Sequence, residues 1–473
     1  MGVTVMKFGG SSLKDPESLR VIADILKKNS FSWRIAVLSA VSGVTNRLIS
    51  ATNDALENEG SIPGSVEAIQ KIHDPLIQAV VTDRSVRAET VKNFDGFYGR
   101  LKKLLKGVAY TGEATHSTRD HILSLGERMA VHLMSGCLAC GGVRTRPVES
   151  DSIGMVAHGP FGQGTVDLVR SRKPVSRYFH ELFHDGFLPC VTGFFGETED
   201  GQPITFGRGG SDYSAAVIAN ALEAERLEIW KDVDGFLTGS PEFVANPQLL
   251  SSLSYDEAAE LSYFGAKILH PRTVEPLLER KIPIVIRNTF RPDAVGTWIG
   301  PERHLRDGIV KSVTYSKNAG MLRLHGPDVG YAVGLLSRLV SQLSDLDINI
   351  RSVMTSQTCI NILLDRTDLQ KAYHHLSAMK IESIDALEPE EKISIVAVVG
   401  EGLDQAEGLV SRVIQSLARA DVHTEMIIAG ASRVAAYFIV DEDKLKRAVT
   451  RVHDEFFGAA NRAKKTGGES ESK

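Results

Sequence analysis

The sequence predicts an α/β protein with a large N-terminal domain, built on an open and mainly parallel sheet flanked by helices, and two smaller C-terminal modules. Three observations lead to this prediction. The chain has 473 residues, more than one hydrophobic core usually serves. Its start reads strand, glycine turn, helix, strand. Beyond about Arg306, one pattern of elements occurs twice, which indicates a duplicated module.

The composition excludes several classes of function. Charged residues make up 24% and hydrophobic residues 42%, as in ordinary globular proteins, and the formal charge of -5 provides no basic stripe for nucleic acid. The N-terminus lacks the features of a secretion signal, and apolar runs stay well below the roughly 18 residues of a membrane span. We therefore expect a cytoplasmic protein. The four cysteines are too few for a disulfide framework, and the pair Cys137 and Cys140 has no partner pair at zinc spacing, so no metal site is predicted.

The N-terminal domain is expected at residues 1–305. Residues 3–8 (VTVMKF) alternate as a strand, 16–28 have helical spacing after a proline, and 34–43 form a buried strand, so the two strands should be parallel. Residues 48–143 are mainly helical. The remaining elements are expected as strands at 187–196, 204–210, 227–236 and 282–290, and as helices at 211–225 and 255–279.

The C-terminal modules are expected at residues 306–390 and 391–460. Each follows the order β-α-β-β-α, and the likeness is clearest between LLSRLVSQLSDLDIN and LVSRVIQSLARADVH. No nucleophile, base or ligand cluster occurs in them, so a sensing or assembly role is expected. The polar segment 461–473 is predicted to be a disordered tail.

Two glycine-rich stretches are candidates for chemistry. In KFGGSS, Gly9 and Gly10 with Ser11 could cradle an anion by their backbone N–H groups, and Lys7 would add a compact positive charge, although a plain strand-to-helix turn also explains the glycines. The phosphate-loop pattern with a lysine after the glycines is absent. In FGRGGSDYSAA, Arg208 is suited to clamping a carboxylate.

Other candidates each have an ordinary structural explanation as well. Ser211 and Asp212 could do no more than cap the next helix, Lys267 could be a solvated lysine, and Glu127 a surface glutamate. Ser39 and Thr45 follow a buried strand. Because ligands of open α/β sheets bind beyond the carboxyl ends of strands, Lys7, Ser39 and the glycine turns should meet there.

Together these stretches closely resemble the aspartate kinases, members of the amino-acid kinase superfamily, over nearly the whole chain. The motifs that carry the resemblance are KFGGSS (7–12), SAVSGVTN (39–46), LGERM (125–129), VTGFFG (191–196), FGRGGSDYSAA (206–216), IWKDVDG (229–235), FGAKILHP (264–271), IRNTF (286–290) and two C-terminal ACT modules, which have a ferredoxin-like fold.

The resemblance implies transfer of the γ-phosphoryl group of ATP, with Mg²⁺, to the side-chain carboxylate of L-aspartate, the first step toward lysine, threonine and methionine. The same resemblance implies the roles of single residues. Lys7 and Lys267 neutralise charge on the phosphoryl group, and Asp212 orients the lysines. The aspartate pocket consists of Ser39, Thr45, Glu127, Arg208 and Ser211. The nucleotide site consists of Lys7, Gly9, Gly10, Ser11, Lys231, Asp232 and Lys267.

The resemblance also implies an amino-acid effector bound by the ACT modules, for which Ser356, Gln357 and Asn361 are candidates, and a homodimer or larger homo-oligomer. The chain departs from the family at two places. Leu237 and Glu242 stand about where an aromatic residue and an arginine near ATP are usual. Arg351 and Gln357 stand near places where lysine-sensitive relatives carry acids, so we expect lysine alone to inhibit poorly, with another effector such as threonine, or none.

Two alternatives remain at this point. One is another superfamily member, acting on glutamate, N-acetylglutamate or uridylate, which the Arg208 turn, the Glu127 motif and the ACT pair disfavour. The other is a catalytically degraded amino-acid sensor that binds effectors through its ACT pair. Only Leu237 and Glu242 favour the sensor, while the retained Lys7 and Asp212 oppose it.

Overall fold

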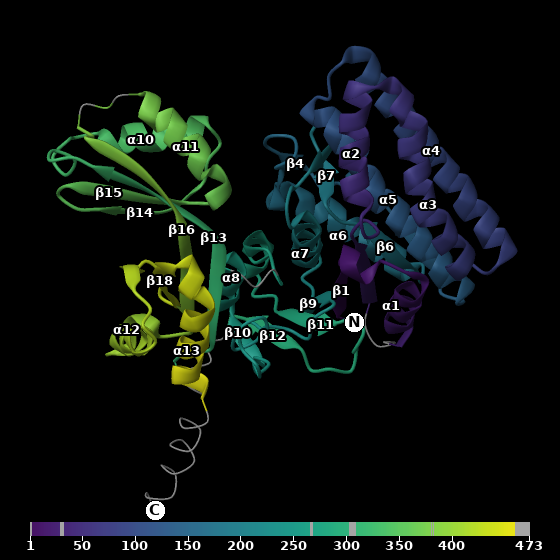
Figure 1. Ribbon diagram of the computed structural model, residues 1–473. Helices are drawn as coiled ribbons and strands as arrows, with labels where there is room; N and C mark the ends of the chain where they lie inside the picture. Colours follow the sequence, from purple (N-terminus) through teal and green to yellow (C-terminus); the bar gives the residue numbers. More distant parts are fainter. Residues whose placement is uncertain are drawn as a thin grey trace, which may run out of the picture. The chain divides into compact units, whose positions relative to one another are not determined.

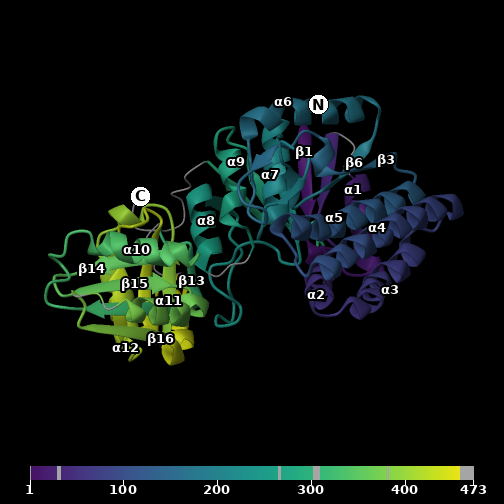
Figure 2. The same cartoon turned by 90° about the horizontal axis from the view of Figure 1, so that it is seen from above.

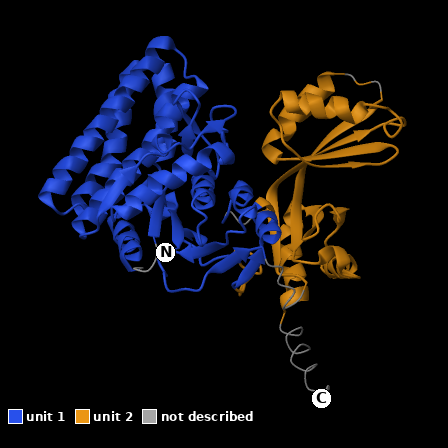
Figure 3. Ribbon diagram, turned by 180° about the vertical axis from the view of Figure 1, so that it is seen from behind, with its two compact units in different colours: residues 1–236, 249–262, 267–304 blue, residues 237–248, 263–266, 305–473 orange. Residues whose placement is uncertain are grey.

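The computed structural model describes residues 2–28, 33–264, 268–301, 309–379, 381 and 383–458. Lys267 and the predicted disordered tail at 461–473 lie outside the described residues. The chain divides into two compact units, coloured separately in Figure 3. Unit 1 comprises residues 1–236, 249–262 and 267–304, and unit 2 comprises residues 237–248, 263–266 and 305–473.

Unit 1 is built on a sheet with the strand order β10-β12-β11-β9-β1-β2-β6-β3. Its strand pairs are parallel except for β11 with β12. All residues of VTVMKF are buried, as expected for a strand covered on both faces of a parallel sheet. The strands are β1 (Val3–Phe8), β2 (Trp33–Leu38), β3 (Thr145–Val148), β6 (Leu188–Thr192), β9 (Arg226–Lys231), β10 (Ser252–Ser254), β11 (Ile284–Asn288) and β12 (Thr297–Gly300).

Two short hairpins accompany this sheet, β4 (Ala157–His158) with β5 (Thr165–Val166) and β7 (Phe195–Glu197) with β8 (Pro203–Thr205). The helices of unit 1 are α1 (Pro16–Lys28), α2 (Val44–Glu57), α3 (Ile62–Val80), α4 (Arg84–Thr111), α5 (His116–Cys140), α6 (Leu168–His184), α7 (Gly210–Ala221), α8 (Tyr255–Phe264), which reaches into unit 2, and α9 (Glu275–Leu278).

Helices α2 to α5 lie side by side, as Figures 1 and 2 show from two directions. Their buried faces share one hydrophobic core with Met6 and Phe8 of the sheet. Helix α4 begins where the Asp83 carboxylate accepts hydrogen bonds from two backbone N–H groups, and it ends at Gly112 in the left-handed conformation. The prediction of a mainly helical segment at 48–143 is therefore confirmed.

The single helix predicted at 255–279 is wrong. Helix α8 ends at Phe264, residues 268–270 are not helical, and a 3-10 turn η4 (Pro271–Thr273) and α9 follow. His270 is extended, with φ -88° and ψ 134°. The reason is Pro271, which has no N–H and disfavours helical geometry in the residue before it.

Unit 2 has a sheet of strand order β14-β15-β13-β16-β18-β17, all antiparallel. The two central strands are long and run on from one module into the other (Figure 1). The elements are β13 (Ser312–His325), α10 (Leu335–Asp345), β14 (Ile350–Thr355), β15 (Cys359–Leu364), α11 (Arg366–Ala378), β16 (Ala386–Val399), α12 (Leu409–Arg419), β17 (Thr424–Ile428), β18 (Ala435–Asp441) and α13 (Leu445–Phe457).

Each module has its own core. Helix α10 buries Leu335, Leu339 and Leu343, spaced four residues apart, and α12 repeats the pattern with its own apolar stripe. The order β-α-β-β-α predicted for both modules is present. The first half of β13 nevertheless belongs to the second core, where Val313 packs beside Val398, so the predicted boundaries at 306–390 and 391–460 do not separate the two cores.

Candidate functional site

A cavity of about 390 Å³ opens in unit 1 at the carboxyl ends of the parallel strands. Lys7 lies near the end of β1, and Ser39 directly follows β2. This is the edge at which the sequence predicted the site. The cavity is lined by Lys7, Gly10, Ser11, Ser39, Ala40, Val41, Ser42, Gly43, Thr45, Glu127, Phe194, Gly207, Arg208, Gly209, Gly210, Ser211 and Asp212.

A carboxylate between two lysines forms the charged centre of this cavity. Lys7 Nζ lies 2.5 Å from Asp212 Oδ1, and Lys231 Nζ lies 3.9 Å from Asp212 Oδ2. Lys7 and Asp212 are both buried. Burial by itself would raise the pKa of Asp212, but the two ammonium groups hold it below its ordinary value. The carboxylate is therefore ionised, and it lines the cavity together with Lys7.

Glu127 is the second buried carboxyl group of the cavity. It comes from α5, and its Oε1 accepts a hydrogen bond of 3.0 Å from the backbone N–H of Ala40. Its Oε2 is buried and has no hydrogen-bond partner among the described residues. Burial raises the pKa of Glu127 to about 8. The neighbouring glycine explains the close approach, since a Cβ on Gly126 would lie 2.9 Å from that of Ala40.

The glycine turn at 206–210 leads into α7. Gly209 is the N-cap residue of this helix and has φ 76°, so no side chain caps the first backbone N–H groups. Ser211 and Asp212 lie in the first turn of α7 and do not cap it, contrary to the capping explanation. The positive end of the helix therefore faces the cavity, where Arg208 is exposed.

The other glycine stretch is arranged differently from the prediction. Gly10–Ser12 form a short 3-10 turn, and α1 begins only at Pro16, so the glycines are not at the mouth of that helix. Gly10 and Ser11 line the cavity, whereas Gly9 is not among its lining residues. The Ser11 hydroxyl donates to Asp232 over 3.4 Å, which places this acid beside the cavity through Ser11.

Phe194 lines the cavity, although no role was predicted for it. It is one of the few residues other than glycine with positive φ, at 77°, and its carbonyl accepts a hydrogen bond of 2.8 Å from Phe206 N–H. Such conformations often occur at functional sites. The positive φ of Phe194 could not be predicted from the motif VTGFFG, because the same residues are compatible with an ordinary strand.

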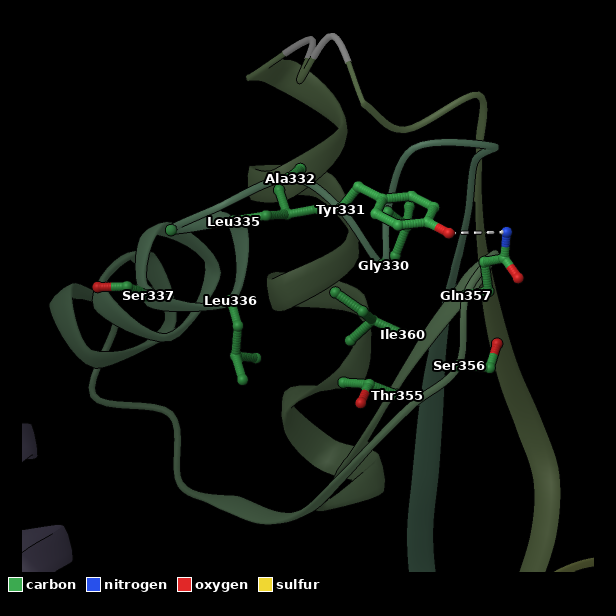
Figure 4. A pocket seen from close by; sticks show the side chains of 12 residues that line it. Gly330, Tyr331, Ala332, Leu335, Leu336, Ser337, Thr355, Ser356, Gln357 and Ile360 are labelled. Carbon is green, nitrogen blue, oxygen red and sulfur yellow. Dashed lines mark hydrogen bonds between the residues drawn. The ribbon is translucent and has the colours of Figure 1, made fainter.

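Unit 2 contains a second pocket, of about 590 Å³, in the first module (Figure 4). It lies between the N-terminal end of α10 and the segment that joins β14 to β15. The Gln357 side chain donates a hydrogen bond of 3.5 Å to the Tyr331 hydroxyl, the dashed line in Figure 4. The lining is uncharged and comprises Val329, Gly330, Tyr331, Ala332, Gly334, Leu335, Leu336, Ser337, Thr355, Ser356, Gln357 and Ile360.

Two of the three predicted effector residues, Ser356 and Gln357, line this pocket, but Asn361 does not. Successive strand residues face opposite sides of a sheet, and Ile360 is the neighbour that faces the pocket. Arg351 is also absent from the lining. Its guanidinium lies 5.0 Å from the ring centre of Tyr263 and donates to the Asn318 carbonyl, so it is no neighbour of a ligand in this pocket.

Glu242 stands about where an arginine near ATP is usual in the family, which left open whether it points toward the nucleotide or away from it. Its carboxylate pairs with Lys317 Nζ at 2.6 Å and accepts a hydrogen bond from the Tyr315 hydroxyl, both within unit 2. The carbonyl of Leu237 accepts from Ser312 Oγ over 2.8 Å in the same unit. The acid therefore has its own cationic partner.

The family model of the amino acid kinase family matches residues 2–288, and an ACT domain model matches residues 396–456. Aspartokinase 1 of Arabidopsis thaliana, a chloroplastic protein, is 32% identical over 469 residues, which cover 96% of this chain and 80% of that protein. A bifunctional aspartokinase/homoserine dehydrogenase of Haemophilus influenzae is 31% identical over 96% of this chain and 56% of its own length.

Solved structures similar to this chain are also aspartokinases. Escherichia coli aspartokinase III, in complex with aspartate and ADP, is 27% identical and superposes with a TM-score of 0.81, covering 96% of this chain and all of that one. The same enzyme in complex with lysine and aspartate also gives a TM-score of 0.81 at 27% identity, covering 96% of this chain and 99% of that one. Within the described part of the chain, no helix is both long and apolar enough to cross a membrane.

Proposed function

Because this chain belongs to the aspartokinases of the amino acid kinase family, it is an ATP-dependent aspartate kinase, and we propose that the cavity of unit 1 is its active site. The reaction moves the γ-phosphoryl group of ATP to the side-chain carboxylate of L-aspartate, giving 4-phospho-L-aspartate and ADP. This is the first step toward lysine, threonine and methionine. The observation that carries the proposal is the buried Lys7–Asp212 pair, with the half-buried Lys231 beside it, near the oxygen of Glu127 that has no partner among the described residues.

Aspartate has one ammonium and two carboxylate groups, and the cavity offers a partner for each. The unpartnered Oε2 of Glu127 is the acceptor for the ammonium group. Arg208 and the start of α7, which no side chain caps, bind the α-carboxylate. Ser39 and Thr45 supply hydroxyls to the same cavity. The side-chain carboxylate is then left to face the lysines.

Phosphoryl transfer depends mainly on positioning and on cations that offset the charge of the moving group. Lys7 and Lys231 provide that charge, and Asp212 fixes the ammonium groups by pairing with both. Lys267, which lies outside the described residues, is assigned the same task by its motif alone. Asp232 and Ser11 are assigned to the nucleotide side, beside Lys231.

Mg²⁺ is expected to arrive with the ATP phosphates, which it commonly binds with few protein ligands. Among the described residues, no group of three or more histidine, cysteine or acidic side chains is placed to hold a metal ion. We therefore assign no protein ligand to it. Its contribution is to offset charge on the phosphates.

The pocket of unit 2 is proposed as the effector site. Its open end of α10, capped by Gly334 without a side-chain hydrogen bond, suits the α-carboxylate of an amino acid. The rest of the lining is hydroxyl, amide and apolar. An uncharged hydroxylated side chain such as that of threonine fits this lining better than the second ammonium group of lysine, which would find no carboxylate there.

A homodimer or larger assembly is also proposed. Strands β14 and β17 are the outer strands of the unit 2 sheet, and an outer strand is a template for pairing with another chain. Light scattering on the purified protein tests this directly. A mass of one chain at micromolar concentration would contradict it.

The activity is tested by trapping the acyl phosphate with hydroxylamine and measuring aspartyl hydroxamate, with L-aspartate, MgATP and the full chain. Glutamate and N-acetylglutamate serve as alternative acceptors. Hydroxamate from aspartate alone is the expected result. Activity with another acceptor only, or none from folded protein, would refute the proposal, and the latter would favour an amino-acid sensor.

A further inference from the structure

Arg208 depends on its backbone for its position. Its side chain is exposed and makes no hydrogen bond or ion pair with other described residues. Whatever holds the turn at 206–210 therefore decides where the guanidinium meets a substrate. Two buried or half-buried charged residues outside the cavity lining do this, Asp120 of α5 and Arg272 of η4.

Asp120 accepts hydrogen bonds from backbone N–H groups of two segments, at Gly162 and at Thr205. Its Oδ2 accepts from Gly162 N–H at 2.9 Å and from Thr205 N–H at 2.8 Å, and its Oδ1 accepts from the Thr205 hydroxyl at 2.8 Å. Asp120 is only 2% exposed, so these bonds are shielded from water. Thr205 directly precedes the turn, and the carboxylate thus fixes the point where the turn begins.

Arg272 binds carbonyl groups of the same two segments. It donates to the carbonyl of Phe206 at 3.0 Å and to that of Gly164 at 2.8 Å, and it reaches the Thr165 hydroxyl at 3.2 Å. Its guanidinium also lies 4.6 Å from the ring centre of Tyr213, the residue after Asp212. One side chain therefore connects the turn, the segment at 164–165 and the first turn of α7.

Asp120 and Arg272 complement each other. The Asp120 carboxylate accepts hydrogen bonds from N–H groups, and the Arg272 guanidinium donates hydrogen bonds to carbonyl groups. The two segments are also joined directly, because Gly164 N–H donates to the Thr205 carbonyl at 2.8 Å. His270, the residue before Pro271, also contacts the turn. A Cβ on Gly209 would lie 2.4 Å from the side chain of His270, so the turn is pressed against the segment that carries Arg272.

We propose that Asp120 and Arg272 are positioning residues for aspartate recognition, acting by fixing the turn that carries Arg208. They touch no substrate themselves. The inference rests on the proposed role of Arg208 in the unit 1 cavity. It also joins two motifs that are separate in the sequence, because the stretch after FGAKILHP holds the stretch FGRGG in place.

The test measures KM for aspartate, KM for ATP and kcat in Arg272→Lys, Asp120→Asn and Thr205→Val. Lysine keeps the charge of Arg272 but loses its planar fork. We expect KM for aspartate to rise about tenfold in the first two variants and less in Thr205→Val, with KM for ATP unchanged. Arg280→Lys is the matched control, since Arg280 pairs with Glu223 and does not contact the turn.

A merely structural role is separated by repeating Arg272→Lys in an Arg208→Ala background. If Arg272 acts through Arg208, the second substitution should add almost nothing to KM for aspartate. A full additional rise, or an equal rise in KM for ATP, would overturn the inference. If Arg208→Ala alone left KM for aspartate unchanged, the proposed role of Arg208 would fail instead. Should Arg272→Lys fold poorly, Thr205→Val, which removes the hydroxyl bond to Asp120, takes its place, and it too should add almost nothing to KM for aspartate in the Arg208→Ala background.

Discussion

The cavity of unit 1 and the pocket of unit 2 differ in how they treat charge. The cavity has a buried ammonium group, that of Lys7, paired with Asp212 and a half-buried second one, that of Lys231, beside the same carboxylate, and it buries the carboxyl group of Glu127, which has one oxygen without a partner among the described residues. The pocket has no charged side chain in its lining. Moving a phosphoryl group requires fixed cations, whereas recognition of an amino acid can rely on helix N–H groups and hydroxyls. Under the functions proposed above, the difference in charge distinguishes a catalytic site from a binding site.

Removing the central cation of the cavity should have the largest effect. Lys7→Ala is expected to lower kcat about 10³-fold, because it removes a buried charge aimed at the moving phosphoryl group and leaves the more distant Lys231 as the lysine partner of Asp212 within the described residues. Hydroxamate formation measures it. Lys71→Ala is the control, since Lys71 pairs with Glu67 on the surface of α3. A loss of less than tenfold in Lys7→Ala would mean that the charged centre is not catalytic.

The raised pKa of Glu127 predicts a pH dependence. Below its pKa of about 8 the free enzyme holds this carboxyl protonated, and binding the substrate ammonium requires the carboxylate. KM for aspartate should therefore fall about tenfold as pH rises from about 6.5 to about 8, while the dependence disappears in Glu127→Gln and KM is high throughout. A pH profile that is the same in both proteins would contradict this assignment.

Stability gives an independent check on the same group. Its folded pKa of about 8 lies above its ordinary value of 4.5, so the folded state holds a proton that the unfolded state has released. The free energy of unfolding should fall as pH rises between these values, and the part due to Glu127 should be absent in Glu127→Gln. Urea denaturation at several pH values measures it, with Glu67→Gln as the surface control.

A charge introduced into the pocket of unit 2 tests its neutrality. In the unchanged protein, lysine alone should inhibit poorly and threonine better. Gln357→Glu should lower the lysine concentration for half inhibition about fivefold, since a carboxylate near a partly exposed ammonium is worth about 1 kcal/mol. Gln342→Glu, on α10 but outside the lining, should not. Abolition of activity by low lysine in the unchanged protein would refute the neutral-effector proposal.

The smallest effect is expected at Glu242. Because its carboxylate is exposed and already paired with Lys317, Glu242→Arg should change KM for ATP by less than about twofold. The hydroxamate assay at varied ATP concentration measures this KM. A fall in KM of fivefold or more would mean that this position faces the nucleotide after all, and that the departure from the family weakens ATP binding.

Local patterns in the sequence determined much of this protein. The strand-like run VTVMKF of β1, the four-residue spacing in α10 and its repeat in α12 specify elements whose type does not depend on distant partners. The motif order indicated the family, and the strand ends indicated which edge of the sheet holds Lys7 and Ser39. The expected helix at 255–279 failed where Pro271 interrupts it.

The burial and the partners of the charged residues depend on the tertiary structure. Glu127, Asp120 and Arg272 look like ordinary helix or surface residues in the sequence, yet packing buries or half-buries them and gives each a defined set of partners. Arg351 and Glu242 were placed near ligand sites by their positions along the chain. In the structure they contact residues that are distant in the sequence, Arg351 the ring of Tyr263 and Glu242 the ammonium group of Lys317. A sequence lists which charges exist, but burial and the partners that compensate it depend on contacts between distant segments.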